Sequence, residues 1–152
     1  MEQFFGQLSL ALALGLGAVG SALGIGAAGR AAAGAWAKEA KAGKPLNFSY
    51  IILTGMPLSQ TIYAFILVLV GLLPKIQDAA YVQQYAGALL SIGIAGGLAE
   101  LFSAWLQGLI GGAACRALSE GEGKGLVFMI IAMGIVETVG LFGFVFLLLV
   151  LP

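Results

Sequence analysis

Four long apolar stretches restrict most strongly what this chain can fold into. They cover residues 4–42, 48–73, 79–118 and 125–151. Each exceeds the ~20 residues that a helix needs to cross ~30 Å of hydrocarbon. A membrane β-barrel would need segments of ~10 residues with alternating polarity, and a backbone in lipid must satisfy its own hydrogen bonds. We therefore expect an all-α membrane protein with four transmembrane helices.

The charge content agrees with a membrane location. Only 9% of the residues are charged and 61% are hydrophobic, whereas soluble domains contain about 25% charged residues. The basic residues form no stripe that could follow nucleic-acid phosphates, so we expect no nucleic-acid partner. The chain has no histidine, no nucleotide-binding Walker motif and no nucleophile–base pair. We therefore expect no catalytic activity in the chain itself.

The distribution of basic residues predicts the orientation in the membrane. Short connections are expected at 43–45, 74–78 and 119–124, and all but one of the seven basic residues lie around the first and third. The positive-inside rule therefore places loops 43–46 and 119–124 in the cytoplasm and both termini outside. The first and third stretches exceed one bilayer crossing, so their helices should project on the cytoplasmic side.

The two halves of the chain resemble each other. A shift of 77 positions lays 57–65 over 134–142 and pairs Gln60 with Glu137. The first and third stretches align more loosely, near an offset of 82, where Ser21 meets Ser103. A repeat of two helices in the same direction indicates a duplicated hairpin, predicted at 1–76 and 77–152. Such units are suited to stacking with copies of themselves.

Glu137 is the first candidate functional residue. It lies within the last apolar stretch, and no arginine, lysine or histidine occurs between Gly125 and the C-terminus. An ionised side chain in the middle of a bilayer costs on the order of 2.5–3.5 kcal/mol, so such residues usually mark ion pathways.

Several other polar groups share the predicted depth of Glu137. They are Ser59, Gln60 and Tyr63 in the second stretch, Gln107 in the third and Thr138 in the fourth. Glu137 lies 13 residues beyond Lys124, and Gln107 lies 12 residues before Ser119. At 1.5 Å per residue, both lie about 18–20 Å inward. Pro57 also frees backbone oxygens in the second helix.

Oxygen ligands with one carboxylate suit a hard monovalent cation, so Na⁺ or a proton is expected at this level. The structural alternative is that the glutamines and serines bond neighbouring helices while a permanently protonated Glu137 donates one hydrogen bond. The repeat pairs Glu137 with Gln60, so one half has a carboxyl group where the other has an amide. This difference argues for a functional role rather than a purely structural one.

Glu100 is a second carboxyl group in the apolar part of the chain. It lies seven residues before Gln107, on a similar face and about 10 Å farther out. We expect a protonated, hydrogen-bonded side chain that packs between helices. The alternative is a second ion or proton position that supports the site around Glu137.

Three segments resemble the rotor-ring proteolipid of V-type (V/A-type) ATPases. They are PLSQTIY at 57–63, LQG at 106–108 and IVET at 135–138. The resemblance covers almost the whole chain. It implies a closed ring of identical subunits, with the first and third helices inside, a membrane stator subunit that carries an arginine, and a central-stalk subunit. It also implies that the ring contacts lipid and that the membrane is a bacterial plasma membrane.

The resemblance further implies a sodium site. Members that transport sodium hold the ion with a glutamate, two glutamines, a hydroxyl group and the carbonyl group before a proline. The corresponding groups in this chain belong to Glu137, Gln60, Gln107, Ser59 and Met56. Tyr63 matches a tyrosine that bonds the glutamate. The resemblance therefore predicts Na⁺, or else H⁺, as the transported ion.

Two other function classes are compatible with parts of the sequence. A small proton-coupled four-helix exporter also uses one intramembrane glutamate, but in a first helix, and here none occurs between Glu2 and Glu39. A passive channel or membrane scaffold would explain the glycines but not the cluster of oxygen atoms. A large ring of the purified protein would favour the rotor-ring function, whereas a dimer would favour the exporter.

Overall fold

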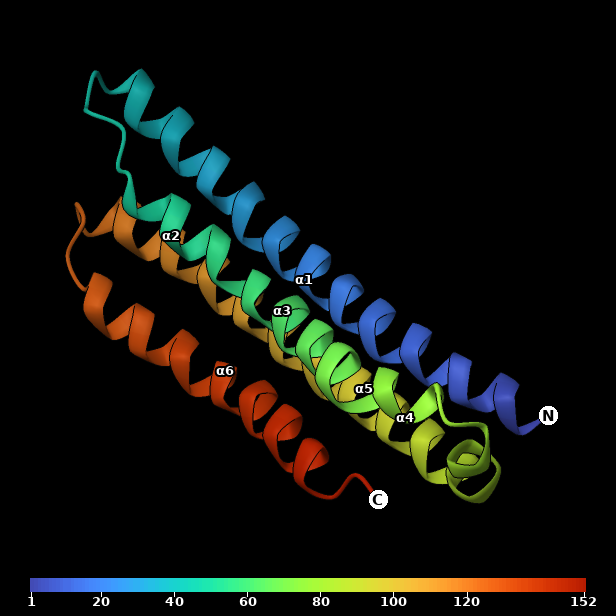
Figure 1. Ribbon diagram of the computed structural model, residues 1–152. Coiled ribbons are helices and arrows are strands. Elements are labelled where there is room, and N and C mark those ends of the chain that lie inside the picture. The colour runs from blue at the N-terminus through green and yellow to red at the C-terminus, as the bar shows by residue number, and fades with distance from the viewer.

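The computed structural model describes residues 1–152 as four long helical spans (Figure 1). The first is α1 (Glu2–Lys41), the third is α5 (Ala79–Glu120) and the fourth is α6 (Leu126–Leu149). The second consists of α2 (Ser49–Gly55), η1 (Met56–Leu58), α3 (Ser59–Ile66), η2 (Leu67–Leu72) and α4 (Leu73–Ile76). All four spans are long and apolar enough to cross a membrane, which confirms the all-α prediction.

Two prolines interrupt the regular hydrogen bonding of the second span. Pro57 lies in the 3₁₀ turn η1, and Pro74 follows the wide π-helical turns of η2. Proline lacks the backbone N–H of a regular helix, and altered turns accommodate its ring. The predicted end of this helix before Pro74 is therefore wrong, because the span continues to Ile76.

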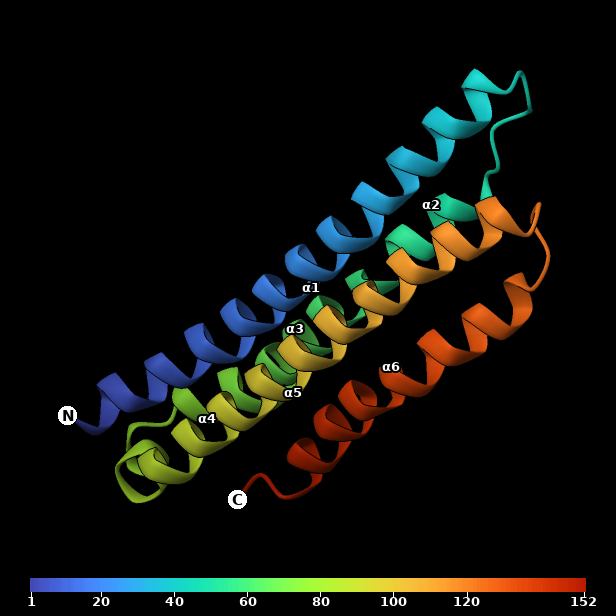
Figure 2. The ribbon, with the colours of Figure 1, turned by 180° about the vertical axis from the view of Figure 1, so that it is seen from behind.

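α1 and α5 make the most extensive contact in the chain and lie side by side in both ribbon views (Figures 1 and 2). Glycines bring their backbones together. A side chain at Gly20 would overlap the backbone of Leu101, and one at Gly24 would overlap that of Ala104. Small residues allow this close approach between membrane helices. Gly20 and Gly24 therefore allow α1 to pack directly against the backbone of α5.

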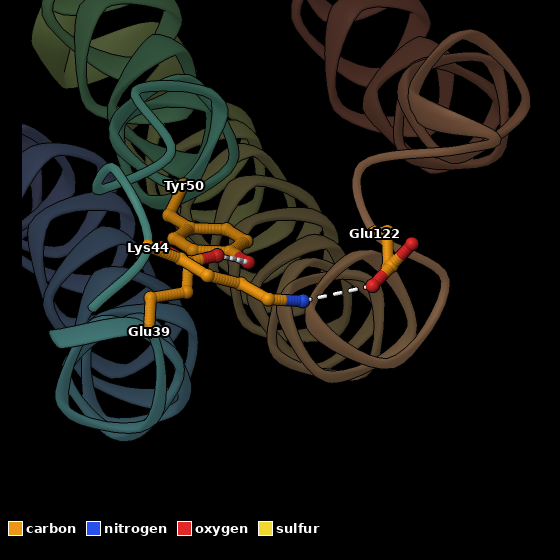
Figure 3. Close-up of polar contacts among 4 residues, drawn as sticks. All are labelled: Glu39, Lys44, Tyr50 and Glu122. Atoms are coloured by element: carbon orange, nitrogen blue, oxygen red, sulfur yellow. Dashed lines mark hydrogen bonds and ion pairs between the residues drawn. The ribbon is translucent and has the colours of Figure 1, made fainter. Parts of the chain in front are cut away.

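The loops 42–48 and 121–125 lie together at one end of the bundle (Figure 1). Lys44 donates to the Glu122 carboxylate at 2.8 Å, which links the two loops (Figure 3). Glu39 accepts the Tyr50 hydroxyl at 2.5 Å and the backbone N–H of Asn47 at 2.9 Å, which fixes the entry into α2. Both termini lie at the other end of the bundle (Figure 1).

Two apolar clusters fill the bundle. One, towards the termini, includes Leu67, Leu72 and Leu89, and the other, towards the loops, includes Leu53, Leu118 and Met133. The buried polar side chains are Ser9, Ser21, Gln60, Glu100, Ser103 and Gln107. All of these except Ser9 lie at intermediate positions along their spans. A polar layer thus separates the two apolar clusters and holds the candidate site.

Candidate ion-binding site

The Glu137 carboxyl group lies where α6 meets α3 and α5. Tyr63 of α3 donates its hydroxyl to Oε1 at 3.1 Å. Gln107 of α5 donates Nε2 to Oε2 at 3.3 Å, and the same nitrogen lies 3.3 Å from the carbonyl oxygen of Met133. The Tyr63 ring stacks on Phe144, with centroids 6.0 Å apart and planes 9° apart. The structure thus brings the three side chains together at one level.

A second hydrogen-bonded group begins in η1, one turn before Tyr63. The Ser59 hydroxyl lies 3.0 Å from the Met56 carbonyl oxygen and 3.2 Å from Gln60 Oε1. Gln60 is fully buried and donates Nε2 to the Ser103 hydroxyl at 3.1 Å. Ser103 in turn donates to the carbonyl oxygen of Val136 at 2.9 Å, next to Glu137 in the chain. This second group therefore contacts α6 next to the group formed by Tyr63, Gln107 and Glu137.

Gln107 Oε1 is buried and has no hydrogen-bond partner. A buried acceptor without a partner costs about 1–3 kcal/mol, so native structures usually satisfy it with a protein group, water or an ion. This oxygen shares a side chain with the nitrogen that holds Glu137. The donor set is made of carboxylate, amide, hydroxyl and carbonyl oxygens, which suits a hard cation.

Thr138 and Glu100 do not join this cluster by hydrogen bonds. The Thr138 hydroxyl is exposed and donates to the carbonyl oxygen of Ile135 in its own helix at 2.7 Å. Glu100 is fully buried, and neither of its carboxyl oxygens has a hydrogen-bond partner. The expectation that Glu100 is hydrogen-bonded is therefore wrong, because its Oε2 atom faces Gly140, which has no side chain to bond it.

Ser103 is the site residue that the sequence prediction missed. Its hydroxyl connects Gln60 of α3 to the α6 backbone, as described above. Two signals could have identified it. Ser103 lies four residues before Gln107, on the same helix face, and it aligns with Ser21 in the repeat. Ser21 is also hydrogen-bonded to the second span, since it accepts the Thr61 hydroxyl at 2.7 Å.

The sequence profile of the ATP synthase C-subunit family matches residues 8–70 and 90–150 of the chain. The chain belongs to this family. As a member, it is a non-catalytic, ion-translocating proteolipid of a rotary ATPase and an integral multi-pass membrane protein. Proteins of the family form oligomeric rings that work with a stator subunit. No curated protein matches the chain significantly.

The family match distinguishes between the function classes left open by the sequence. A rotor-ring proteolipid accounts for two similar hairpins, and each matched segment lies within one of the predicted repeats. The exporter and the passive scaffold do not account for this match. The boundary between 76 and 77 stays a prediction.

Proposed function

We propose that this proteolipid carries Na⁺ on Glu137 in the rotor ring of an ATP-driven V-type ATPase. The observation that carries the proposal is the unpartnered Gln107 Oε1 beside the Glu137 carboxyl group. A proton on Glu137 needs no further ligands, whereas a sodium ion needs several oxygen atoms around it. A free amide oxygen at this place therefore supports a metal cation as the transported ion.

The proposed ligands are the Glu137 carboxylate, the amide oxygens of Gln60 and Gln107, the Ser59 hydroxyl and the Met56 carbonyl group. Met56 and Ser59 lie around Pro57, where the 3₁₀ turn displaces the backbone from regular helix geometry. Tyr63 holds the carboxylate in place through its hydroxyl. One carboxylate and one monovalent cation give a neutral loaded site, which suits Na⁺ better than Ca²⁺ or Mg²⁺.

Neutralisation of Glu137 couples rotation to transport. A loaded copy has no net charge at the site and can face lipid, whereas an empty copy leaves a carboxylate whose exposure to lipid is costly. An empty copy must therefore stay near a cation, which the proposed arginine of the stator subunit provides. ATP hydrolysis in partner subunits turns the ring past this arginine.

The charge asymmetry of the bundle supports the proposed orientation. Loops 42–48 and 121–125 form the basic end, so we place them in the cytoplasm, where a central-stalk subunit would contact them. The membrane is proposed to be a bacterial plasma membrane. In the ring, α1 and α5 lie inside, and the second span and α6 lie outside. One carboxylate per four helices means few ions per turn, which suits pumping against a steep gradient.

The substitution Glu137→Gln tests this function. Glutamine has nearly the same shape but no charge, so the variant ring should assemble and lose sodium transport in reconstituted vesicles. Thr138→Val is the matched control, because Thr138 neighbours Glu137 but its hydroxyl bonds its own helix. The control should transport sodium normally. A Glu137→Gln ring that still pumps sodium would contradict the proposal.

A further inference from the structure

Glu100 is the one fully buried carboxyl group that the proposed transport site does not use. Its side chain extends from α5 towards Gly140 of α6, where an added Cβ atom would lie 2.6 Å from Glu100 Oε2. On the other side, an added Cβ at Gly17 of α1 would lie 3.5 Å from Glu100 Cβ and 2.7 Å from Ala64 Cβ of α3. Four helical segments therefore meet around this side chain.

No cation lies near Glu100 to balance a negative charge. On α5, the nearest basic residue is Arg116, 16 residues away, or about 24 Å along the helix. α1 carries no charged residue between Glu2 and Arg30, and α6 carries none except Glu137. The titratable groups of the facing helices are thus Tyr63 and Glu137, neither of which provides a positive charge.

The contacts of the neighbouring polar side chain also argue against a metal ion at Glu100. A Cβ atom added at Gly140 would lie 3.0 Å from Ser103 Oγ as well as 2.6 Å from Glu100 Oε2. However, the Ser103 hydroxyl already accepts a hydrogen bond from Gln60 and donates one to the Val136 carbonyl oxygen. Glu100 thus has no set of free oxygen atoms around it such as a sodium ion requires. An ionised carboxylate with neither a cation nor a hydrogen bond is the most costly state of this group in a membrane, and the neutral acid costs far less.

We propose that Glu100 is a second proton-binding site in each copy, and that it keeps its proton throughout the transport cycle. The ligand is a single proton, held on a carboxyl oxygen that faces Gly140. The geometry separates the two carboxyl groups by role: Glu137 reaches partners on two spans at the transport level, whereas Glu100 is enclosed within one copy.

The retained proton has a consequence for transport, and this step alone rests on the proposed function. A loaded copy is neutral only if Glu137 contributes its single negative charge and Glu100 contributes none. An ionised Glu100 would leave each loaded copy with a negative charge inside the bilayer. Glu100 must therefore stay neutral for a loaded copy to pass through lipid.

Infrared spectroscopy of the purified ring tests the proposal. In saturating Na⁺ at neutral pH, the wild-type ring should show the carbonyl stretching band of a neutral carboxylic acid, with the intensity of one group per copy. The Glu100→Gln variant assigns the band, because the other acidic residues apart from Glu137 lie at the ends of the bundle and are unchanged in it. The band should be lost in Glu100→Gln and should remain in the matched control Glu137→Gln.

Sodium binding to the same rings gives an independent measurement. Wild type and Glu100→Gln should each bind one Na⁺ per copy, with affinities within about twofold of each other, because glutamine is also neutral. A wild-type ring without the neutral-acid band, or with two Na⁺ per copy against one in Glu100→Gln, would overturn the proposal. If Glu100→Gln does not assemble, the wild-type band and stoichiometry still decide the question.

The two proposals can fail separately. If Glu137 does not bind sodium, the wild-type ring will bind no Na⁺ at this site, and adding or removing Na⁺ will leave the spectrum unchanged. The neutral-acid band at Glu100 would still be present in that case. If Glu100 is ionised instead, the band will be missing while sodium binding at Glu137 is retained.

Discussion

Replacing Tyr63 by phenylalanine should weaken the preference of the site for sodium over protons. Tyr63 donates its hydroxyl to Glu137 Oε1 at 3.1 Å, and its ring stacks on Phe144. Phenylalanine keeps the ring and its stacking and removes only the donor. The hydrogen bond stabilises the ionised carboxylate, which is the form present both in the empty site and in the sodium-loaded site.

The magnitude follows from this geometry. A hydrogen bond to a charged group contributes about 1.5–3 kcal/mol, and O–H···O⁻ bonds are usually shorter, about 2.5–2.7 Å. The longer observed bond places Tyr63 near the lower limit, about 1.5 kcal/mol, which corresponds to a factor of about ten. Glu137 in Tyr63→Phe should therefore bind a proton about tenfold more tightly, while its intrinsic sodium affinity should change little.

The assay measures the Na⁺ concentration that half-protects Glu137 from a carbodiimide, at several pH values. At high pH, where protons do not compete, wild type and Tyr63→Phe should require the same Na⁺ concentration. As the pH falls, the variant should require up to about tenfold more. Tyr85→Phe is the control, because Tyr85 lies near the start of α5 and its hydroxyl accepts from Gln84.

Two results would refute this reasoning. An equal increase in the required Na⁺ concentration at all pH values would mean that Tyr63 contributes to sodium binding itself rather than to competition with protons. No increase at any pH would mean that the hydrogen bond to Glu137 does not affect its ionisation.

Two further predictions concern packing and the loops. Gly24→Ala should destabilise the ring by about 1–3 kcal/mol through overpacking, because the added Cβ would overlap the Ala104 backbone. Gly26→Ala is the control and should not destabilise the ring, because no atom lies within 4 Å of its added Cβ. Equal thermal stability of the two rings would contradict this prediction. Lys44 lowers the pKa of Glu122, and Glu122 raises the pKa of Lys44. Their coupling should be present above the unfolded carboxyl pKa of about 4.3 and below the unfolded lysine pKa of about 10.4. The coupling should be lost as the pH falls through the folded pKa of Glu122 or rises through that of Lys44. A double-mutant cycle at pH 7 and pH 3 measures the coupling energy, and equal values at the two pH values would contradict the prediction.

The four spans could be predicted because the length of an apolar stretch is set by the thickness of the bilayer. The depth of each residue in the membrane could also be predicted, because a helix advances a fixed distance per residue. Counting from the loop ends was therefore enough to place Gln107 and Glu137 at one level, and the structure joins them by a hydrogen bond. The end of the second span was harder to predict, because the π-helical turns of η2 absorb Pro74.

The direction of individual side chains could not be predicted from depth alone. Thr138 follows Glu137 in the chain, but one residue turns a helix by about 100°, so its hydroxyl faces away from the cluster. The sequence could have placed Ser103 on the same helix face as Gln107, but its partners Gln60 and the Val136 carbonyl group depend on how α5 packs against α3 and α6. Glu100 was placed on the correct face, but its lack of hydrogen bonds depends on Gly140 leaving space opposite it.

Carbodiimide labelling of the purified ring, analysed by mass spectrometry with and without sodium, tests the central claim most directly. The reagent reacts with a protonated carboxyl group. We predict modification at Glu137 that sodium suppresses, because a bound ion excludes the proton from the same oxygen atoms. Labelling of Glu137 that is indifferent to sodium would contradict the sodium site and indicate a proton-carrying ring. No labelling at Glu137 would contradict its role as the ion carrier.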